Sequence, residues 1–338
     1  MLATLLHMTE FILPTLIFII GLFLLVKSSD YFIEGAASTA IHLNIAPLVI
    51  GVVVLGFGTS MPEIIVSILA SMDGTPGLAI GNVIGSNIAN IALVLGFAAL
   101  IAPIIVKSSI LKRELPLLLI ISSAGILLIL DGTLDHLDGI LLLITLFTVM
   151  FWMIKANNQS QKNPNTQDPL ASEITHELEE ISDLSLKTAI LYLILGLIVL
   201  MASAKMMVWG AVEIAHLFGI SEIIIGLTII AIGTSLPELA AAVAAARKNE
   251  ADLMIGNILG SNLFNLLAVL AMPALIAPGK IDSNILFLDY PIMLLLTLAM
   301  LIAALPRKGR AEITRTEGAL LLSAYIAYLI FLYYRTVS

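Results

Sequence analysis

Two isolated glutamates are the residues best placed to do chemistry. Glu63 is the only formally charged residue in the apolar stretch 35–72, and Glu238 is the only one in 223–246. Each follows a Gly-Thr-Ser run and a proline, in the sequences GTSMPE and GTSLPE. An ionised carboxylate at the centre of a bilayer costs roughly 2.5–3.5 kcal/mol on insertion scales. The pattern therefore indicates carboxylates that face a cavity and bind a cation.

The position of each glutamate along its helix supports this interpretation. Glu63 lies ten residues before Asp73, which is about 15 Å of helix and half the hydrocarbon thickness. Glu238 lies nine residues before Arg247, about 14 Å from the opposite face. We expect both carboxylates to reach the membrane midplane from opposite sides.

Both motifs also have the form of a capping box, in which Ser60 and Glu63, and likewise Ser235 and Glu238, would exchange hydrogen bonds at a helix N-terminus. A cap belongs at a helix end, and these ends would lie in mid-membrane. The two interpretations combine if Gly56, Gly58 and Pro62 break the helix there. Unwound backbone is allowed in the membrane where it is buried in protein or lines a cavity. We expect freed carbonyls, hydroxyls and carboxylates to form an oxygen cage.

The segment after each motif adds polar groups. GNVIGSNIAN (81–90) and GNILGSNLFN (256–265) have glycines four residues apart, which permits close helix packing. A packing seam alone would explain the glycines, but not the polar pairs at the same spacing, Ser86 with Asn90 and Ser261 with Asn265. We expect these side chains to face the glutamates.

An all-oxygen site of this kind suits a hard cation. Ca²⁺ takes about 6–8 oxygen ligands, and two carboxylates match its charge. Mg²⁺ fits less well because it dehydrates reluctantly, and zinc would lack His or Cys ligands. The chain contains no cysteine.

The composition places these residues in a membrane protein. Of the 338 residues 59% are hydrophobic and 12% charged, with a mean hydropathy of +1.07. Soluble domains carry about 25% charged residues. The net charge of −8 argues against nucleic acid as a partner. The sequence indicates no protein partner, and we expect small inorganic cations and the lipid bilayer to be the only partners.

The predicted fold is an all-α multi-pass membrane protein with ten transmembrane helices. We expect them near residues 11–26, 45–71, 78–102, 115–130, 139–154, 188–204, 221–246, 251–277, 285–305 and 317–334. Shifting the chain by 175 residues overlays it on itself without a gap, so that Gly58-Thr59-Ser60 falls on Gly233-Thr234-Ser235. Residues 1–154 and 188–338 would then be two five-helix repeats. An odd number of helices per repeat requires opposite orientations, which is the inverted-repeat plan of secondary transporters.

The distribution of Lys and Arg predicts the orientation. Thirteen of the 16 basic residues lie in one set of loops, which includes Lys27 and the polar linker 155–187. The positive-inside rule makes this set cytoplasmic and places both termini on the outer side of the cytoplasmic membrane.

At these motifs the sequence resembles the cation/calcium exchanger superfamily, and within it the bacterial calcium/sodium antiporters. The resemblance covers nearly the whole chain. It implies ten transmembrane helices, a site between the second, third, seventh and eighth, and two long helices, the first of each half, that rock against the rest. It also implies that the central acids are Glu63 and Glu238. The resemblance further implies carbonyl ligands at Thr59 and Thr234, hydroxyl ligands at Ser60, Ser86, Ser235 and Ser261, and small positions contributing carbonyls at Gly56 and Ala231.

The sequence departs from the sodium/calcium exchangers at one pair of positions. Those exchangers typically pair an asparagine with an aspartate, whereas Asn90 and Asn265 are both asparagine here. The proton/calcium branch similarly lacks the third acid. We expect exchange of Ca²⁺ for Na⁺, because the hydroxyl and carbonyl oxygens would be idle in a purely proton-driven site. A H⁺/Ca²⁺ antiporter using the same two glutamates is the alternative.

Two other functions are weaker interpretations. A channel needs a continuous path, whereas inverted repeats with broken midplane helices favour alternating access. An intramembrane enzyme would need a base near Ser60 or Ser235, and the five histidines lie at predicted helix ends or in loops. No P-loop appears, so ATP is not the expected driving force, and no cofactor is expected besides the transported Ca²⁺ and Na⁺ (or H⁺).

Overall fold

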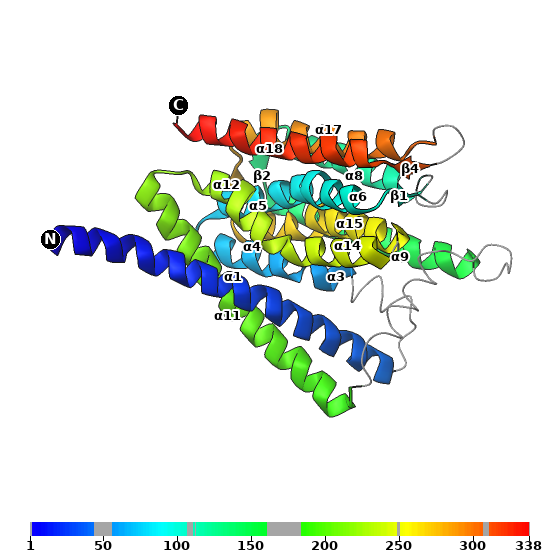
Figure 1. Ribbon diagram of the computed structural model, residues 1–338, viewed down its shortest axis with the longest axis horizontal. Helices are drawn as coiled ribbons and strands as arrows, with labels where there is room; N and C mark the ends of the chain where they lie inside the picture. Colours follow the sequence, from blue (N-terminus) through cyan, green and yellow to red (C-terminus); the bar gives the residue numbers. More distant parts are fainter. Residues whose placement is uncertain are drawn as a thin grey trace.

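The computed structural model describes residues 2–43, 56–106, 111, 113–160, 184–248, 251–306 and 311–337. These residues are mostly helical (Figure 1). In the first half the elements are α1 (Leu2–His42), α3 (Gly56–Thr59), α4 (Met61–Met72), α5 (Pro76–Ala89), the π-helical turn η2 (Asn90–Leu95), α6 (Gly96–Ile101), β1 (Ile104–Ile105), α8 (Glu114–Ile129), β2 (Thr133–Leu134) and α9 (His136–Ser160).

The second half contains the same order of elements. It comprises α11 (Leu186–Phe218), α12 (Glu222–Ile225), the π-helical turn η3 (Gly226–Ile230), α13 (Ala231–Thr234), α14 (Leu236–Lys248), α15 (Ala251–Phe264), η4 (Asn265–Val269), α16 (Ala271–Ile276), β3 (Gly279–Lys280), η5 (Ile285–Asp289), α17 (Tyr290–Ala304), β4 (Glu312–Ile313) and α18 (Arg315–Val337). The four two-residue strands are the departure from the all-α prediction.

The two longest helices form a pair beside the remaining bundle (Figure 1). A Cβ added to Gly21 of α1 would lie 2.9 Å from backbone atoms of Ser203 and Met207, and one on Gly210 of α11 would lie 2.7 Å from the Pro14 carbonyl oxygen. Pro14 comes before Gly21 in α1, but its partner Gly210 comes after Ser203 and Met207 in α11. The two helices are therefore antiparallel. Small residues allow this close approach of two backbones.

Both helices of this pair are longer than the sequence predicts. The predicted spans 11–26 and 188–204 end where polar residues begin, but α1 continues to His42 and α11 to Phe218. Lys27 therefore lies inside a helix, and its assignment to a loop was wrong. Its ammonium lies 3.9 Å from the Asp30 carboxylate, an i,i+3 pair that a helix accommodates. The predicted linker 155–187 is likewise helical at both described ends.

The central helices lie in the protein interior, whereas the long pair faces outward. In the apolar 18-residue windows of Pro76–Ile101 and Met254–Ile276, 78% and 83% of the window is buried, against 28% for the window in Leu186–Phe218. Gly81 brings α5 against α12 and η3, since a Cβ there would lie 2.5 Å from the Ile223 carbonyl oxygen and 3.0 Å from the Leu227 nitrogen. The close packing predicted for the first glycine pair is confirmed, whereas the prediction is wrong at Gly260 of the second pair, where a Cβ would meet no described atom within 4 Å.

Each end of the bundle has a short antiparallel strand pair that joins the two halves. β1 pairs with β4, with Ile104 opposite Ile313, and β2 pairs with β3, with Thr133 opposite Lys280. β1 and β3 are equivalent in the 175-residue register, whereas β2 falls four residues before β4.

Six described helices are long and apolar enough to cross a membrane. A seventh candidate is the bent pair of Glu222–Thr234 and Leu236–Arg247. Three shorter apolar helices cover Met61–Met72, Glu114–Ile129 and His136–Trp152. The count of ten spans remains a prediction, and the part of the second predicted span before residue 56 lies outside the described residues.

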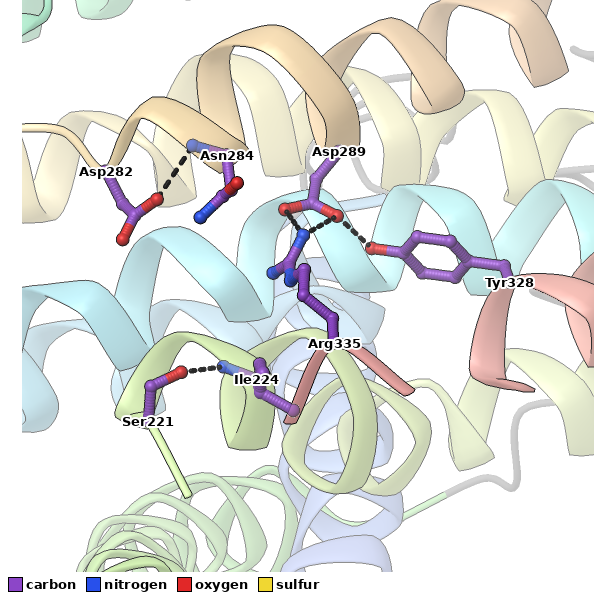
Figure 2. Close-up of polar contacts among 7 residues, drawn as sticks. All are labelled: Ser221, Ile224, Asp282, Asn284, Asp289, Tyr328 and Arg335. Carbon is purple, nitrogen blue, oxygen red and sulfur yellow. Dashed lines mark hydrogen bonds and ion pairs between the residues drawn. The ribbon is translucent and has the colours of Figure 1, made fainter. Parts of the chain in front are cut away.

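A buried ion pair fastens the last helix to the bundle (Figure 2). Asp289 is fully buried, and Arg335 Nη1 lies 3.0 and 3.2 Å from its two carboxylate oxygens. The Tyr328 hydroxyl donates a third hydrogen bond to this carboxylate at 2.9 Å. The C-terminal part of α18 is thereby tied to the start of α17.

We expect Arg335→Met to lower stability by roughly 3 kcal/mol, because it leaves the buried Asp289 carboxylate without its cation. Thermal melting of the detergent-purified protein measures this, with the exposed Arg315→Met as control. Adding Asp289→Asn should recover most of the loss. A wild-type melting temperature for Arg335→Met would contradict the assignment.

Candidate functional site

Each GTSxPE motif of the repeat breaks a helix at its serine. α3 ends at Thr59 and α4 begins at Met61, while α13 and α14 are separated by Ser235. Ser60 and Ser235 share nearly the same backbone angles, φ −85°, ψ 3° and φ −83°, ψ 4°. Each following proline lacks the N–H that would bond the carbonyl four residues earlier. The predicted helix breaks are therefore confirmed.

The capping boxes expected at these breaks are not formed. Ser60 makes no side-chain capping bond, and within the described part of the chain neither Ser60 Oγ nor Ser235 Oγ has a hydrogen-bond partner. The same holds for both carboxylate oxygens of Glu63. Backbone bonds continue across the breaks, as from Ile64 N–H to Ser60 O at 3.1 Å, so the serine and glutamate side chains remain available for another role.

The two asparagines of the candidate site each begin a π-helical turn. Asn90 starts η2 and Asn265 starts η4, where Leu270 N–H donates to the Asn265 carbonyl five residues back at 3.0 Å. The sequence predicts continuous helices over 78–102 and 251–277 and gives no sign of these turns. Single π-turns occur frequently at functional sites.

One hydrogen-bonded chain leads to Glu238. Ser261 Oγ donates to Glu238 Oε1 at 3.3 Å, and Thr59 Oγ1 lies 3.3 Å from Ser261 Oγ. Since Ser261 has a single hydroxyl hydrogen, Thr59 is the donor in the second contact. This chain joins α3 of the first half to α15 and α14 of the second.

The other half contains the equivalent contact, in which each partner is shifted by 175 residues. Ser86 Oγ and Thr234 Oγ1 lie 3.3 Å apart, as the repeat predicts from the Ser261–Thr59 contact. Both hydroxyls also bond Asn82 Oδ1, at 3.4 and 3.1 Å. A third contact between the halves runs from Asn90 Nδ2 to Asn262 Oδ1 at 3.2 Å. Each half therefore completes the polar groups of the other.

Several buried oxygens of the site accept no hydrogen bond from the residues that the structure describes. They are Glu63 Oε1 and Oε2, Glu238 Oε2, Ser60 Oγ, Ser235 Oγ, Asn90 Oδ1 and Asn265 Oδ1. Their residues are at most 2% exposed. A buried polar group without a partner costs about 1–3 kcal/mol, so this cluster favours a cation.

Two predicted site residues remain, Ala231 and Gly56. Ala231 is fully buried at the start of α13, and its carbonyl accepts from Thr234 Oγ1 at 3.4 Å. Gly56 begins α3, but its burial and neighbours are not among the features that the structure describes. Among the described residues no cluster of three or more His, Cys, Asp and Glu occurs, so the two glutamates supply the negative charge.

Sequence reasoning missed the amides that hold the hydroxyls. Asn82 and Asn262 bond site residues directly, and Ser67 Oγ lies 3.4 Å from Asn82 Nδ2. The available signal was the repeat itself, because Asn82 falls on Asn257 and Asn262 on Asn87. The register does not tell which asparagine of each equivalent pair hydrogen-bonds to the site residues.

Comparisons with known proteins place the chain in a family. The model of the family described as "Sodium/calcium exchanger protein" matches residues 13–155 and 188–334, which is most of the chain. The chain belongs to the sodium/calcium exchanger family. Its residues 156–187, between the two matched segments, correspond to most of the predicted linker.

Three relatives illustrate the similarity. The putative antiporter CaxA of Alkalimonas amylolytica is 44% identical over 94% of this chain and 98% of its own length. The inner membrane protein YrbG of Escherichia coli K12 is 42% identical over 96% and 98%, and the sodium/calcium exchanger MaX1 of Methanosarcina acetivorans 33% identical over 94% and 98%. A solved structure of the sodium–calcium exchanger NCX_Mj soaked with Na⁺ and Ca²⁺ matches with a TM-score of 0.64 and 34% identity, over 94% of this chain and 98% of that one. This exchanger-family chain is thus a multi-pass membrane protein.

We expect Glu63→Gln and Glu238→Gln each to weaken Ca²⁺ binding by at least about 100-fold, because each removes a charge that the cation needs in a dry site. Isothermal titration of the purified protein measures the affinity. Glu222→Gln at the start of α12 is the matched control and should bind Ca²⁺ as the wild type does. Wild-type Ca²⁺ affinity in Glu63→Gln or Glu238→Gln, with folding intact, would contradict the site assignment.

Proposed function

We propose that this protein is a secondary antiporter that exchanges Ca²⁺ for Na⁺ at the site built around Glu63 and Glu238. The observation that carries the proposal is the cluster of buried oxygens without hydrogen-bond donors, with two carboxylates at its centre. Two negative charges neutralise one Ca²⁺, and Ca²⁺ accepts the many oxygen ligands available here.

The proposed ligands are the twelve predicted residues. They comprise the carboxylates of Glu63 and Glu238, the amides of Asn90 and Asn265, the hydroxyls of Ser60, Ser86, Ser235 and Ser261, and carbonyls at Thr59, Thr234, Gly56 and Ala231. Antiport follows if Ca²⁺ and the counter-ion exclude each other from the carboxylates. Two Na⁺ ions balance the same charge as one Ca²⁺, so such an exchange would move little net charge.

The name of one relative, a sodium/calcium exchanger, supports Na⁺ as the counter-ion. Proton coupling is the second candidate, because Asn90 and Asn265 leave the site with two acids rather than three. The surrounding hydroxyls favour Na⁺, which uses their oxygens as ligands.

We propose alternating access by two inverted repeats with ten spans. Three observations support this: the 175-residue register of the elements, the antiparallel α1–α11 pair, and helices broken beside the site. The α1–α11 pair would rock against the central bundle. Transport of this kind needs no covalent chemistry, so no enzymatic activity is proposed.

The proposed location is the cytoplasmic membrane, with residues 155–187 inside the cell and both termini outside. This orientation rests on the Lys and Arg distribution of the loops, even without Lys27. Small cations and lipid are the proposed partners.

We expect Ca²⁺ uptake into proteoliposomes to require an opposing Na⁺ gradient. Radioactive Ca²⁺ should enter Na⁺-loaded vesicles and barely respond to a K⁺ diffusion potential, because the exchange is near electroneutral. The double variant Glu63→Gln/Glu238→Gln is the inactive control. Uptake that ignores Na⁺ but follows a pH gradient would favour the proton alternative, and uptake that needs no counter-gradient would indicate a channel.

The topology is tested by single cysteines, since the natural chain has none. We expect a cysteine at position 165 to be protected from an impermeant maleimide in intact cells and to react after permeabilisation. A cysteine at position 338 should react in intact cells. The opposite pattern would reverse the proposed orientation.

A further inference from the structure

Asn82 links three elements of the site through its side-chain amide. It lies on α5 and is fully buried. Its Oδ1 accepts from Thr234 Oγ1 at 3.1 Å and from Ser86 Oγ at 3.4 Å. Its Nδ2 donates to the Glu63 carbonyl at 3.5 Å and to Ser67 Oγ at 3.4 Å. One amide thus joins α4, α5 and α13.

The chemistry of these partners fixes how the amide is turned. The backbone carbonyl of Glu63 can only accept a hydrogen bond, so the Asn82 NH₂ group faces it. The Oδ1 atom must then face the two hydroxyls on the other side. Each hydroxyl has one hydrogen, and Asn82 Oδ1 is an acceptor within reach of both; for Thr234 Oγ1 it is nearer, at 3.1 Å, than the Ala231 carbonyl oxygen at 3.4 Å.

This arrangement matters for a cation because hydroxyl ligands bind metal ions through their lone pairs. A hydroxyl whose hydrogen points into the site repels a cation, whereas one whose hydrogen is held elsewhere presents only oxygen. When the Ser86 and Thr234 hydroxyls donate to Asn82 Oδ1, their lone pairs are left free for a cation. It also fixes the backbone at Glu63 itself.

We propose that Asn82 is a positioning residue for cation binding, which orients the Ser86 and Thr234 hydroxyls and the Glu63 backbone without touching the ion. This inference rests on the proposed function. The repeat does not reproduce the arrangement: Asn257, in the same place of the second half, is only half-buried, and its Nδ2 has no partner among the described residues.

The test compares Asn82→Ala with the matched control Asn257→Ala in Na⁺-loaded proteoliposomes, using radioactive Ca²⁺ as the probe. Asn82→Ala should raise the KM for Ca²⁺ about tenfold, which corresponds to one well-placed hydrogen-bonded group. The maximal rate should change less than threefold. Asn257→Ala should shift the KM less than threefold.

A double-mutant cycle separates positioning from a general loss of stability. If Asn82 acts through the two hydroxyls, Asn82→Ala should change the KM much less when Ser86→Ala and Thr234→Val are already present. Equal effects in both backgrounds, or equal effects of Asn82→Ala and Asn257→Ala, would overturn the proposal. Its failure is distinct from failure of the proposed function: Asn82→Ala with a wild-type KM removes only this inference, whereas full activity in the glutamate variants removes the site.

Discussion

The burial of two carboxyl groups, Glu63 and Glu238, is the constraint from which the rest of this architecture follows. Glu63 and Glu238 are inaccessible to solvent, and three of their four carboxylate oxygens have no donor in the described part of the chain. The exposed apolar faces of the outer helices are suited to lipid. A protein keeps two such buried carboxyl groups only if other groups, a counter-ion or both offset the cost of burying them.

The backbone around the pair is adapted to supply oxygens rather than regular helices. Breaks at Ser60 and Ser235 remove donors from nearby carbonyls, and π-turns begin at Asn90 and Asn265. Within a membrane, irregular backbone is tolerated only where it is buried in protein or lines a cavity. The close contact of α5 with η3 through Gly81 provides that enclosure, and the long α1–α11 pair covers one side of the bundle.

The sequence predicted those features that depend on residue type at a fixed spacing. The isolated charges identified Glu63 and Glu238, proline and glycine identified the breaks, and the 175-residue register paired the polar segments. It failed where helix length is set by packing, because the polar run at Lys27 was taken for a loop although Gly35 continues the contact with α11. It also could not reveal the π-turns or the asymmetry between Asn82 and Asn257, since both halves carry the same motif and only tertiary contacts distinguish them.

The hydrogen bonds that cross between the two halves can form only after both halves have been synthesised. Thr59 and Ser261 are 202 residues apart in sequence, and the corresponding Ser86–Thr234 contact spans 148. A ribosome adds roughly 5–20 residues per second, so Ser261 is made roughly 10–40 s after Thr59. During this interval the first half holds Glu63 in the membrane without the groups that the second half supplies. Until the second half is made, the site is therefore half-built and carries a single acid.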